Sequence, residues 1–125
     1  MPKFSVIIPL YNKANYIAAT INSVLSQSLG DFELLIINDC STDDSVKIAK
    51  GFNDPRIKII EHKINKGLSA SRNTGIKSAL AQHIAFLDAD DSWKPEFLKS
   101  IDFLIQEYDG ASLFATNYEI LLKNK

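Results

Sequence analysis

The sequence predicts an α/β protein whose sheet is mostly parallel and is covered by helices on both faces. Short apolar runs alternate along the chain with longer segments in which apolar residues recur at helical spacing. Because strand–helix–strand units build parallel sheets, this alternation favours a parallel sheet between two helical layers. The length of 125 residues fits one domain that buries a core without disulfides.

Five apolar runs predict the strands. Residues 4–9 form the first, and Pro9 is expected to end it because proline interrupts the hydrogen-bonded ladder. The second is continuously apolar from Leu34, as expected for a strand covered on both faces. This second strand is predicted at residues 32–37, and the other three are predicted at residues 56–61, 83–87 and 112–122.

Helices are predicted between these strands. Apolar residues at helical spacing indicate a helix over residues 14–28, and Gly30 is its expected stop. Pro95 lies where a proline is favoured, in the first turn of the last helix. The other predicted helices span residues 43–52, 68–81 and 95–108.

The composition excludes several classes of protein. Lys and Arg total 14 and Asp and Glu total 15, so the net charge of −1 gives no basic face for nucleic acid. Cys40 is the only cysteine, which excludes a disulfide framework and a thiolate metal site and favours a reducing compartment. The N-terminus lacks the pattern of a signal peptide, and no apolar run approaches the ~20 residues of a membrane span.

An acidic motif follows the fourth predicted strand. Asp88, Asp90 and Asp91 place three carboxylates within four residues, and their mutual repulsion must be offset by water, a cation or protonation. Asp88 and Asp90 converge only if the chain turns after Leu87. Hard oxygen ligands suit Mg²⁺ or Mn²⁺. A solvated acidic loop before a helix is the alternative interpretation.

A second polar segment follows the second predicted strand. Ser41 with Asp44 three positions on fits a capping box, which gives residues 41–44 a structural role. Asp39 precedes this cap and lies at the strand's carboxyl end, where its carboxylate can accept a hydrogen bond from a ligand. Cys40 is interpreted as a small filler, since no basic partner is near it in sequence.

Arg72 lies four positions from Leu68 and from Ile76, so the three fall near one stripe of a helix. On that apolar side an arginine needs an anionic partner, either Asp88 or Asp90 in a salt bridge or a phosphate. Gly75 in the same helix indicates close approach by another backbone. Lys66 and Gly67 add a cation and a flexible backbone just before this helix.

Aromatic and imidazole side chains complete the candidates. Tyr11 follows the first strand and is able either to stack on a base or to pack as a simple lid. Trp93 is interpreted as a core or interface anchor. His62 and His83 show no partner spacing, so both are assigned structural roles.

Four motifs together resemble the family 2 glycosyltransferases. They occur in that family's order and spacing, and the resemblance covers the chain from Phe4 to about Leu98. Trp93 and Pro95 also fit the segment that follows the acidic motif. The motifs are residues 5–12 (SVIIPLYN), 37–43 (INDCSTD), 65–75 (NKGLSASRNTG) and 86–91 (FLDADD).

The resemblance implies a GT-A, nucleotide-diphospho-sugar transferase fold, with a Rossmann-like and mostly parallel sheet. It implies inverting transfer of a sugar from a nucleotide-diphosphate donor, most often a UDP-sugar, to a glycan or lipid-linked acceptor. Tyr11 and Asp39 would contact the base, and Arg72 would lie near the base and phosphates. Asp90 would hold Mn²⁺ or Mg²⁺, and Asp88 would bind the ribose or the metal. Pro9 joins the expected nucleotide-binding residues.

Two departures from the family pattern stand out. The chain has Asn38-Asp39-Cys40 where the family usually has Asp-Asp-Gly, and Ser71 replaces the usual alanine. The general base expected from the family would lie beyond Lys125, so no catalytic residue is assigned. Residues 1–125 are therefore expected to be a single donor-binding domain, cut before the acceptor-binding half. The expected location is cytoplasmic, with membrane association allowed through the missing parts.

Two other functions remain open from the residues. A response-regulator receiver domain has similar length and alternation, but it needs an acidic pair where this chain has Tyr11 and Asn12. A non-catalytic nucleotide-binding or interaction module would keep the pocket without the chemistry.

Overall fold

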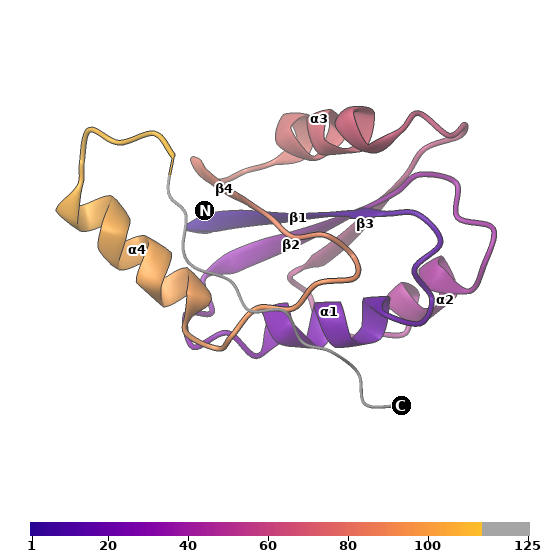
Figure 1. The fold of residues 1–125 in the computed structure, drawn as a ribbon, viewed down its shortest axis with the longest axis horizontal. Helices are drawn as coiled ribbons and strands as arrows, with labels where there is room; N and C mark the ends of the chain where they lie inside the picture. The colour runs from indigo at the N-terminus through magenta and orange to yellow at the C-terminus, as the bar shows by residue number, and fades with distance from the viewer. Residues whose placement is uncertain (114–125) are drawn as a thin grey trace.

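The computed structural model describes residues 1–113, and these form one sheet with helices on both sides (Figure 1). The strands are β1 (Phe4–Leu10), β2 (Phe32–Asn38), β3 (Ile57–Glu61) and β4 (His83–Phe86). The helices are α1 (Ile17–Leu25), α2 (Ser45–Lys50), α3 (Leu68–Ser78) and α4 (Phe97–Glu107). The predicted strand at residues 112–122 lies outside the described residues, except for positions 112 and 113, which are not in a strand.

The sheet is parallel throughout and has the order β3-β2-β1-β4. In the register of the sheet, Ile7 of the central strand β1 lies between Leu35 of β2 and Phe86 of the edge strand β4. Every residue of β1 and β2 is buried, which confirms the expectation of strands covered on both faces. The α/β alternation of the sequence therefore translates directly into the predicted parallel sheet.

Alternate residues of the central strands feed two separate cores. On one face, Val6 and Ile8 pack with apolar residues of α1 and α4. On the other face, Ile7 and Leu35 pack beneath α3, which lies alone on that side of the sheet in Figure 1. The two-residue period of a strand explains this division.

Pro9 does not end the first strand, contrary to the sequence prediction. It lies inside β1, opposite Ile37 of β2. The backbone of Ile7 faces β4, since its carbonyl accepts a hydrogen bond from the Leu87 N–H at 3.0 Å. Pro9 faces the same way two residues on, where the pairing with β4 has stopped. The N–H that proline lacks therefore costs the sheet no interstrand bond.

The first helix begins at Ile17 rather than at residue 14, because a neighbouring loop takes the preceding backbone donors. The Asn12 N–H donates to the Ser41 hydroxyl at 3.1 Å, and the Lys13 N–H donates to the Ser45 hydroxyl at 2.8 Å. The Ala14 N–H donates to an Asp43 carboxylate oxygen in the same loop. These bonds join the loop after β1 to the loop after β2.

The predicted capping box at residues 41–44 is wrong. Helix α2 begins at Ser45, and its N-cap Asp44 makes no side-chain capping bond. The Ser41 hydroxyl instead accepts from Asn12, and Asp43 accepts from the Ser45 N–H at 2.9 Å. Long-range loop contacts replace the local cap that the spacing indicated. The other helices are also shorter than predicted at their ends.

Helix α3 approaches the sheet through small residues. Its buried positions are Ser71 and Gly75, and a Cβ on Gly75 would lie 2.6 Å from Cγ2 of Ile7. The close approach predicted at this glycine is therefore real, but its partner is a side chain of β1 and not another backbone. Trp93 stacks on Phe97 with ring centroids 4.4 Å apart and packs against the larger core, as predicted.

Candidate nucleotide and metal site

The loops that follow β1, β2, β3 and β4 meet at the carboxyl edge of the sheet and surround a cleft of about 460 Å³. Such an edge is the usual ligand site of open α/β sheets. The cleft collects most of the predicted site residues. Its lining includes Pro9, Tyr11, Asp39, Asp88 and Asp90. Arg72 is not in the lining and lies beside it, against Asp88.

The chain turns after Leu87, as convergence of the acidic side chains requires. The Asp91 N–H donates to the Asp88 carbonyl at 3.0 Å, while Leu87 and Ala89 are buried. The buried Thr20 hydroxyl of α1 lies 2.8 Å from the Ala89 carbonyl and 2.7 Å from the Asp91 carbonyl. With one proton, it donates to one carbonyl at a time. Helix α1 thus anchors the acidic turn from below.

The donor set of this turn fits a divalent cation. Asp88, Asp90 and Asp91 are exposed, and each offers a carboxylate oxygen within 4.8 Å of the others. Mg²⁺ and Mn²⁺ favour such oxygen ligands. Desolvation raises the pKa of Asp91, and the charges of Asp90 and Asp88 raise it further. The cluster therefore carries the repulsion that a bound cation would relieve.

Two basic side chains partly offset this charge. The Lys13 ammonium lies 3.4 Å from Asp90, and an Arg72 guanidinium nitrogen lies 3.6 Å from Asp88. All four side chains are roughly half exposed, so these ion pairs are weakened by water. Both cations are placed to meet an anionic ligand that enters the cleft.

Asp39 is almost fully buried, with 4% of its surface exposed, and its carboxylate receives three hydrogen bonds. The Lys66 N–H reaches Oδ1 at 2.7 Å and the Gly67 N–H reaches Oδ2 at 2.8 Å. The third comes from His62, 3.0 Å from Oδ1. Burial alone would raise the pKa of Asp39, but these bonds outweigh it and hold the pKa below its usual value. The carboxylate therefore shapes the loop before α3 as well as the cleft.

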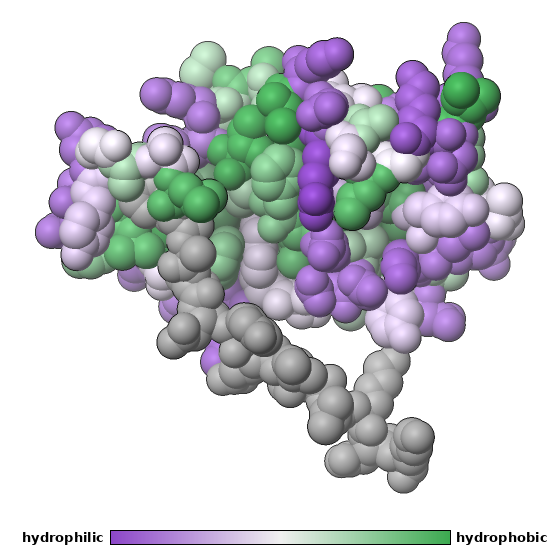
Figure 2. All heavy atoms as spheres, turned by 45° about the horizontal axis from the view of Figure 1, so that its top comes forward, coloured by the Kyte–Doolittle hydropathy of each residue, from purple (hydrophilic) through white to green (hydrophobic). Residues whose placement is uncertain are grey.

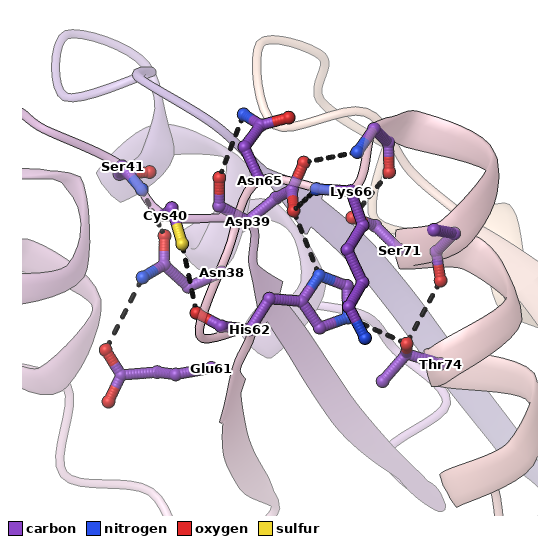
Figure 3. A network of polar contacts seen from close by, with 12 residues as sticks. Asn38, Asp39, Cys40, Ser41, Glu61, His62, Asn65, Lys66, Ser71 and Thr74 are labelled. Atoms are coloured by element: carbon purple, nitrogen blue, oxygen red, sulfur yellow. Dashed lines mark hydrogen bonds and ion pairs between the residues drawn. The ribbon is translucent and has the colours of Figure 1, made fainter.

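Cys40 occupies the position where glycine is usual in the resemblance, and its backbone keeps the left-handed conformation with φ of 61°. Its thiol donates to the His62 carbonyl at 3.1 Å (Figure 3). A side chain is disfavoured at such a φ, so Cys40 holds a backbone conformation that glycine adopts more readily. Cys40 is therefore more than the small filler that the sequence indicated, because its thiol also bonds to His62.

Tyr11 extends from the end of β1 with 47% of its surface exposed, so its ring is free to stack on a ligand. Asn12 has a different task. Its side-chain oxygen accepts hydrogen bonds from the Thr42 N–H at 2.7 Å and the Asp43 N–H at 3.3 Å. Asn12 holds two loops together and leaves Tyr11 as the ligand-facing residue of this pair.

Arg72 is half-buried beside the cleft, on a stripe of α3 that does not face the core. Its neighbours on the stripe, Leu68 and Ile76, are exposed, because α3 packs through its small residues instead. Figure 2 shows apolar and hydrophilic side chains lying side by side on the face that carries α3. The guanidinium lies 5.8 Å over the Phe86 ring and pairs with Asp88, one of the two carboxylates that the sequence indicated as partners.

Sequence reasoning missed the polar residues that hold the site together from a distance. Thr20 lies 71 positions from Asp91, and His62 lies 23 positions from Asp39. Lys13 was not singled out either. No local spacing signals these contacts, because each joins loops that meet only when the sheet assembles.

Comparison with known proteins decides the family. The profile described as Glycosyl transferase family 2 matches residues 5–121. The chain belongs to the family 2 glycosyltransferases. This membership excludes the alternative of a response-regulator receiver domain. No helix within residues 1–113 of this glycosyltransferase is long and apolar enough to cross a membrane.

Its relatives include bacterial glycosyltransferases. The β-1,3-glucosyltransferase WfgD of Escherichia coli, named for transfer from UDP-Glc to α-D-GlcNAc-diphosphoundecaprenol, is 38% identical over 121 residues; the match covers 96% of this chain and 47% of WfgD. Glycosyltransferase GlyA of Streptococcus pneumoniae is 37% identical over 118 residues, covering 93% of this chain and 17% of GlyA. The chain thus spans about half of one relative and less of the other.

The structure of Staphylococcus aureus TarS residues 1–349 in complex with UDP-GlcNAc superposes with a TM-score of 0.81. The two are 34% identical, and the match covers 86% of this chain and 32% of TarS. This likeness confirms the expected GT-A fold.

Proposed function

We propose that residues 1–125 form the donor-binding part of an inverting, metal-dependent glycosyltransferase that uses a UDP-sugar. One observation carries this proposal: an exposed aromatic ring, a buried carboxylate and two carboxylates of the acidic turn line the same cleft at the carboxyl edge of the sheet. TarS, which has the same fold, was solved with UDP-GlcNAc and gives support for the donor class. The acceptor is a glycan or a lipid-linked sugar.

The nucleoside end of the donor is assigned to Tyr11 and Asp39. Tyr11 offers an exposed ring on which a base is able to stack. Asp39 Oδ1 already accepts two hydrogen bonds, but Oδ2 accepts only one, so an acceptor position remains. An imide N–H of uracil is a suitable donor to that position. Pro9 also lines the cleft.

The diphosphate end is assigned to the acidic turn and its basic neighbours. Asp90 and Asp88 would hold Mn²⁺ or Mg²⁺, which when bound neutralises diphosphate charge and stabilises the leaving nucleotide. Arg72 and Lys13 would meet phosphate oxygens with their charged ends once these are drawn away from Asp88 and Asp90. Ionised carboxylates and paired cations make the site ready for a metal–diphosphate complex.

The chemical step needs a base that removes a proton from the acceptor hydroxyl. We assign this base to the acceptor-binding part of the full enzyme, outside residues 1–125, because each acidic group at the cleft already has a donor-site task. The chain by itself is then expected to bind donor and metal and to transfer little sugar. We place the enzyme on the cytoplasmic side, where UDP-sugars would reach it.

Isothermal titration of the chain with UDP, with and without Mn²⁺, tests the proposal. UDP should bind in the presence of Mn²⁺, and Asp90→Ala should remove this metal-dependent binding without unfolding the protein. Asp44→Ala removes an exposed carboxylate that caps no helix bond, and it is the matched control. UDP binding that ignores both Mn²⁺ and Asp90→Ala would refute the metal site. Absence of any UDP binding would refute the donor site and leave a purely structural or interaction module.

A further inference from the structure

His62 links three elements of the donor site through a buried ring (Figure 3). It follows the last residue of β3, and its side chain is only 6% exposed. Its Nδ1 lies 3.0 Å from Oδ1 of Asp39, which follows β2. Its Nε2 lies 2.7 Å from the hydroxyl of Thr74 in α3. One imidazole therefore joins the ends of two strands to a helix.

The protons on this ring follow from its partners. An ionised Asp39 only accepts hydrogen bonds, so Nδ1 carries a proton and donates it. Thr74 has one hydroxyl proton and two neighbours, Nε2 of His62 and the Ala70 carbonyl at 3.0 Å. A neutral ring accepts this proton at Nε2, whereas a charged ring donates to the Thr74 oxygen while the hydroxyl turns to Ala70. The ring keeps both contacts in either state.

This link bears directly on the residue assigned to the nucleobase. His62 and Lys66 occupy Oδ1 of Asp39, and Gly67 occupies one position on Oδ2. The ring thereby fixes the rotation of the carboxylate. The free acceptor position on Oδ2 therefore points in one fixed direction. Thr74 lies two residues after Arg72 on α3, so the same ring also fixes this helix relative to Asp39.

We propose that His62 is a positioning residue of the donor site, which holds the Asp39 carboxylate in the orientation that receives the nucleobase N–H. This inference rests on the proposed function. A ring that only stabilised the fold would affect every ligand of the cleft equally when removed. A positioning ring affects the nucleoside end, while the carboxylates of the acidic turn, held by Thr20, keep their metal affinity.

Two substitutions separate the two contacts of the ring. His62→Asn places an amide nitrogen near the position of Nδ1 and keeps a donor for Asp39. His62→Gln places its amide near the position of Nε2, which keeps a partner for Thr74 and leaves Asp39 without its imidazole. His83 lies on β4, and the centroids of its ring and the Phe4 ring are 6.1 Å apart. His83→Gln is therefore the matched control.

The measurement is an NMR titration of the full chain with uridine and, separately, with Mn²⁺. His62→Gln should weaken uridine binding about tenfold, the size expected for one charge-assisted hydrogen bond, and change Mn²⁺ affinity less than about twofold. His83→Gln should remain within about threefold of the parent for uridine, and His62→Asn, which keeps the donor to Asp39 but not the bond to Thr74, should lose less uridine affinity than His62→Gln. Thr74→Val, which removes the ring's second partner, should weaken uridine binding and spare Mn²⁺ binding.

Equal losses of uridine and Mn²⁺ affinity in His62→Gln would overturn the positioning role and leave a structural one. If His62→Gln fails to fold, unchanged uridine affinity in Thr74→Val overturns it as well. A different result marks failure of the proposed function itself: the unsubstituted chain would then bind neither uridine nor Mn²⁺, and no role at a donor site would remain for His62.

Discussion

The hydroxyl of Thr20 lies 2.7 Å from the carbonyl of Asp91, and this contact joins the first helix to the acidic turn 71 residues later. The same hydroxyl lies 2.8 Å from the carbonyl of Ala89. The Ala89 carbonyl is buried together with Thr20, so loss of this hydroxyl would leave that carbonyl without a donor. The geometry of the carboxylates above the turn therefore depends on a side chain that never faces the ligand.

Thr20→Val tests this dependence. The substitution keeps the shape of the side chain and leaves the buried Ala89 carbonyl without a donor, which costs about 1–3 kcal/mol of stability. Because the turn loosens, Mn²⁺ affinity should fall severalfold in isothermal titration. Thr20→Ser retains the hydroxyl and is the control. Equal Mn²⁺ affinity in the valine and serine variants would show that the turn holds its shape without this bond.

Arg72→Ala should weaken UDP binding more than uridine binding. The guanidinium lies 3.6 Å from Asp88, and under the proposed function it meets the phosphates, so its loss should remove a contact that uridine does not make. A loss of about tenfold for UDP is expected, with little change for uridine, measured by titration in Mn²⁺. Lys77→Ala removes a cation from the last turn of the same helix and controls for net charge. Equal losses for both ligands would place Arg72 at the base instead.

Gly75→Ala should destabilise the protein by about 1–3 kcal/mol, although alanine is the better helix former. The new Cβ would lie 2.6 Å from Cγ2 and 2.9 Å from Cδ1 of Ile7, which is fully buried and has no room to move. Gly110→Ala, where a Cβ meets open space, is the control for the loss of glycine flexibility. Thermal unfolding measures the difference.

If contact with Ile7 causes this loss, substitutions at positions 7 and 75 must be coupled in their effect on the free energy of unfolding. Ile7→Ala removes the opposing atoms and leaves a cavity, which the alanine at position 75 would partly fill. The double variant should therefore lose less stability than the sum of the single losses. A strictly additive result would mean that the contact at Gly75 is not the cause.

Acid should destabilise the fold through Glu33, which is buried in β2. Burial would raise its pKa, but the Leu80 N–H at 2.7 Å, the Ser5 hydroxyl and the Lys58 charge together hold the pKa below its usual value. A lowered pKa in the folded state means that this stabilisation is complete above the usual glutamate pKa of about 4.3 and is lost as the pH falls through the folded value. The melting temperature should therefore drop as the pH falls from about 5 to about 3.

Glu33→Gln identifies the source of this pH dependence. The amide keeps the shape but does not titrate, so the variant should be less stable by about 1 kcal/mol at neutral pH and lose less stability in acid. Glu107→Gln, at the end of α4, should keep the parent's pH dependence. An unchanged acid response in Glu33→Gln would assign the effect to other carboxylates, with Asp39 the next to test because its pKa is also lowered.

The order of strands and helices was predictable because it depends on local patterns. The continuously apolar stretch from Leu34 indicated a strand covered on both faces, and β2 is buried along its whole length. The acidic motif could be placed at the carboxyl edge for the same reason, since polar residues that follow parallel strands share one edge of the sheet. Tyr11, Asp39, Asp88 and Asp90 accordingly line one cleft.

Local patterns failed where distant contacts competed with them. The spacing of Ser41 and Asp44 indicated a capping box, but Asn12 takes the Ser41 hydroxyl from another loop. Pro9 indicated the end of a strand, but the neighbouring ladder stops before it, so its missing N–H has no cost. In both cases the outcome depends on a neighbouring segment that is distant in the sequence. Its position is set only when the sheet assembles.

The sequence alone determined which side chains reach the donor cleft, because their place after each strand fixes the edge at which they lie. Only the tertiary structure decided how they are held: Thr20 beneath the acidic turn, and His62 between Asp39 and Thr74. A hydrogen bond acts over about 3 Å, whereas these partners are separated by many residues of chain, so folding must bring them together before either contact exists.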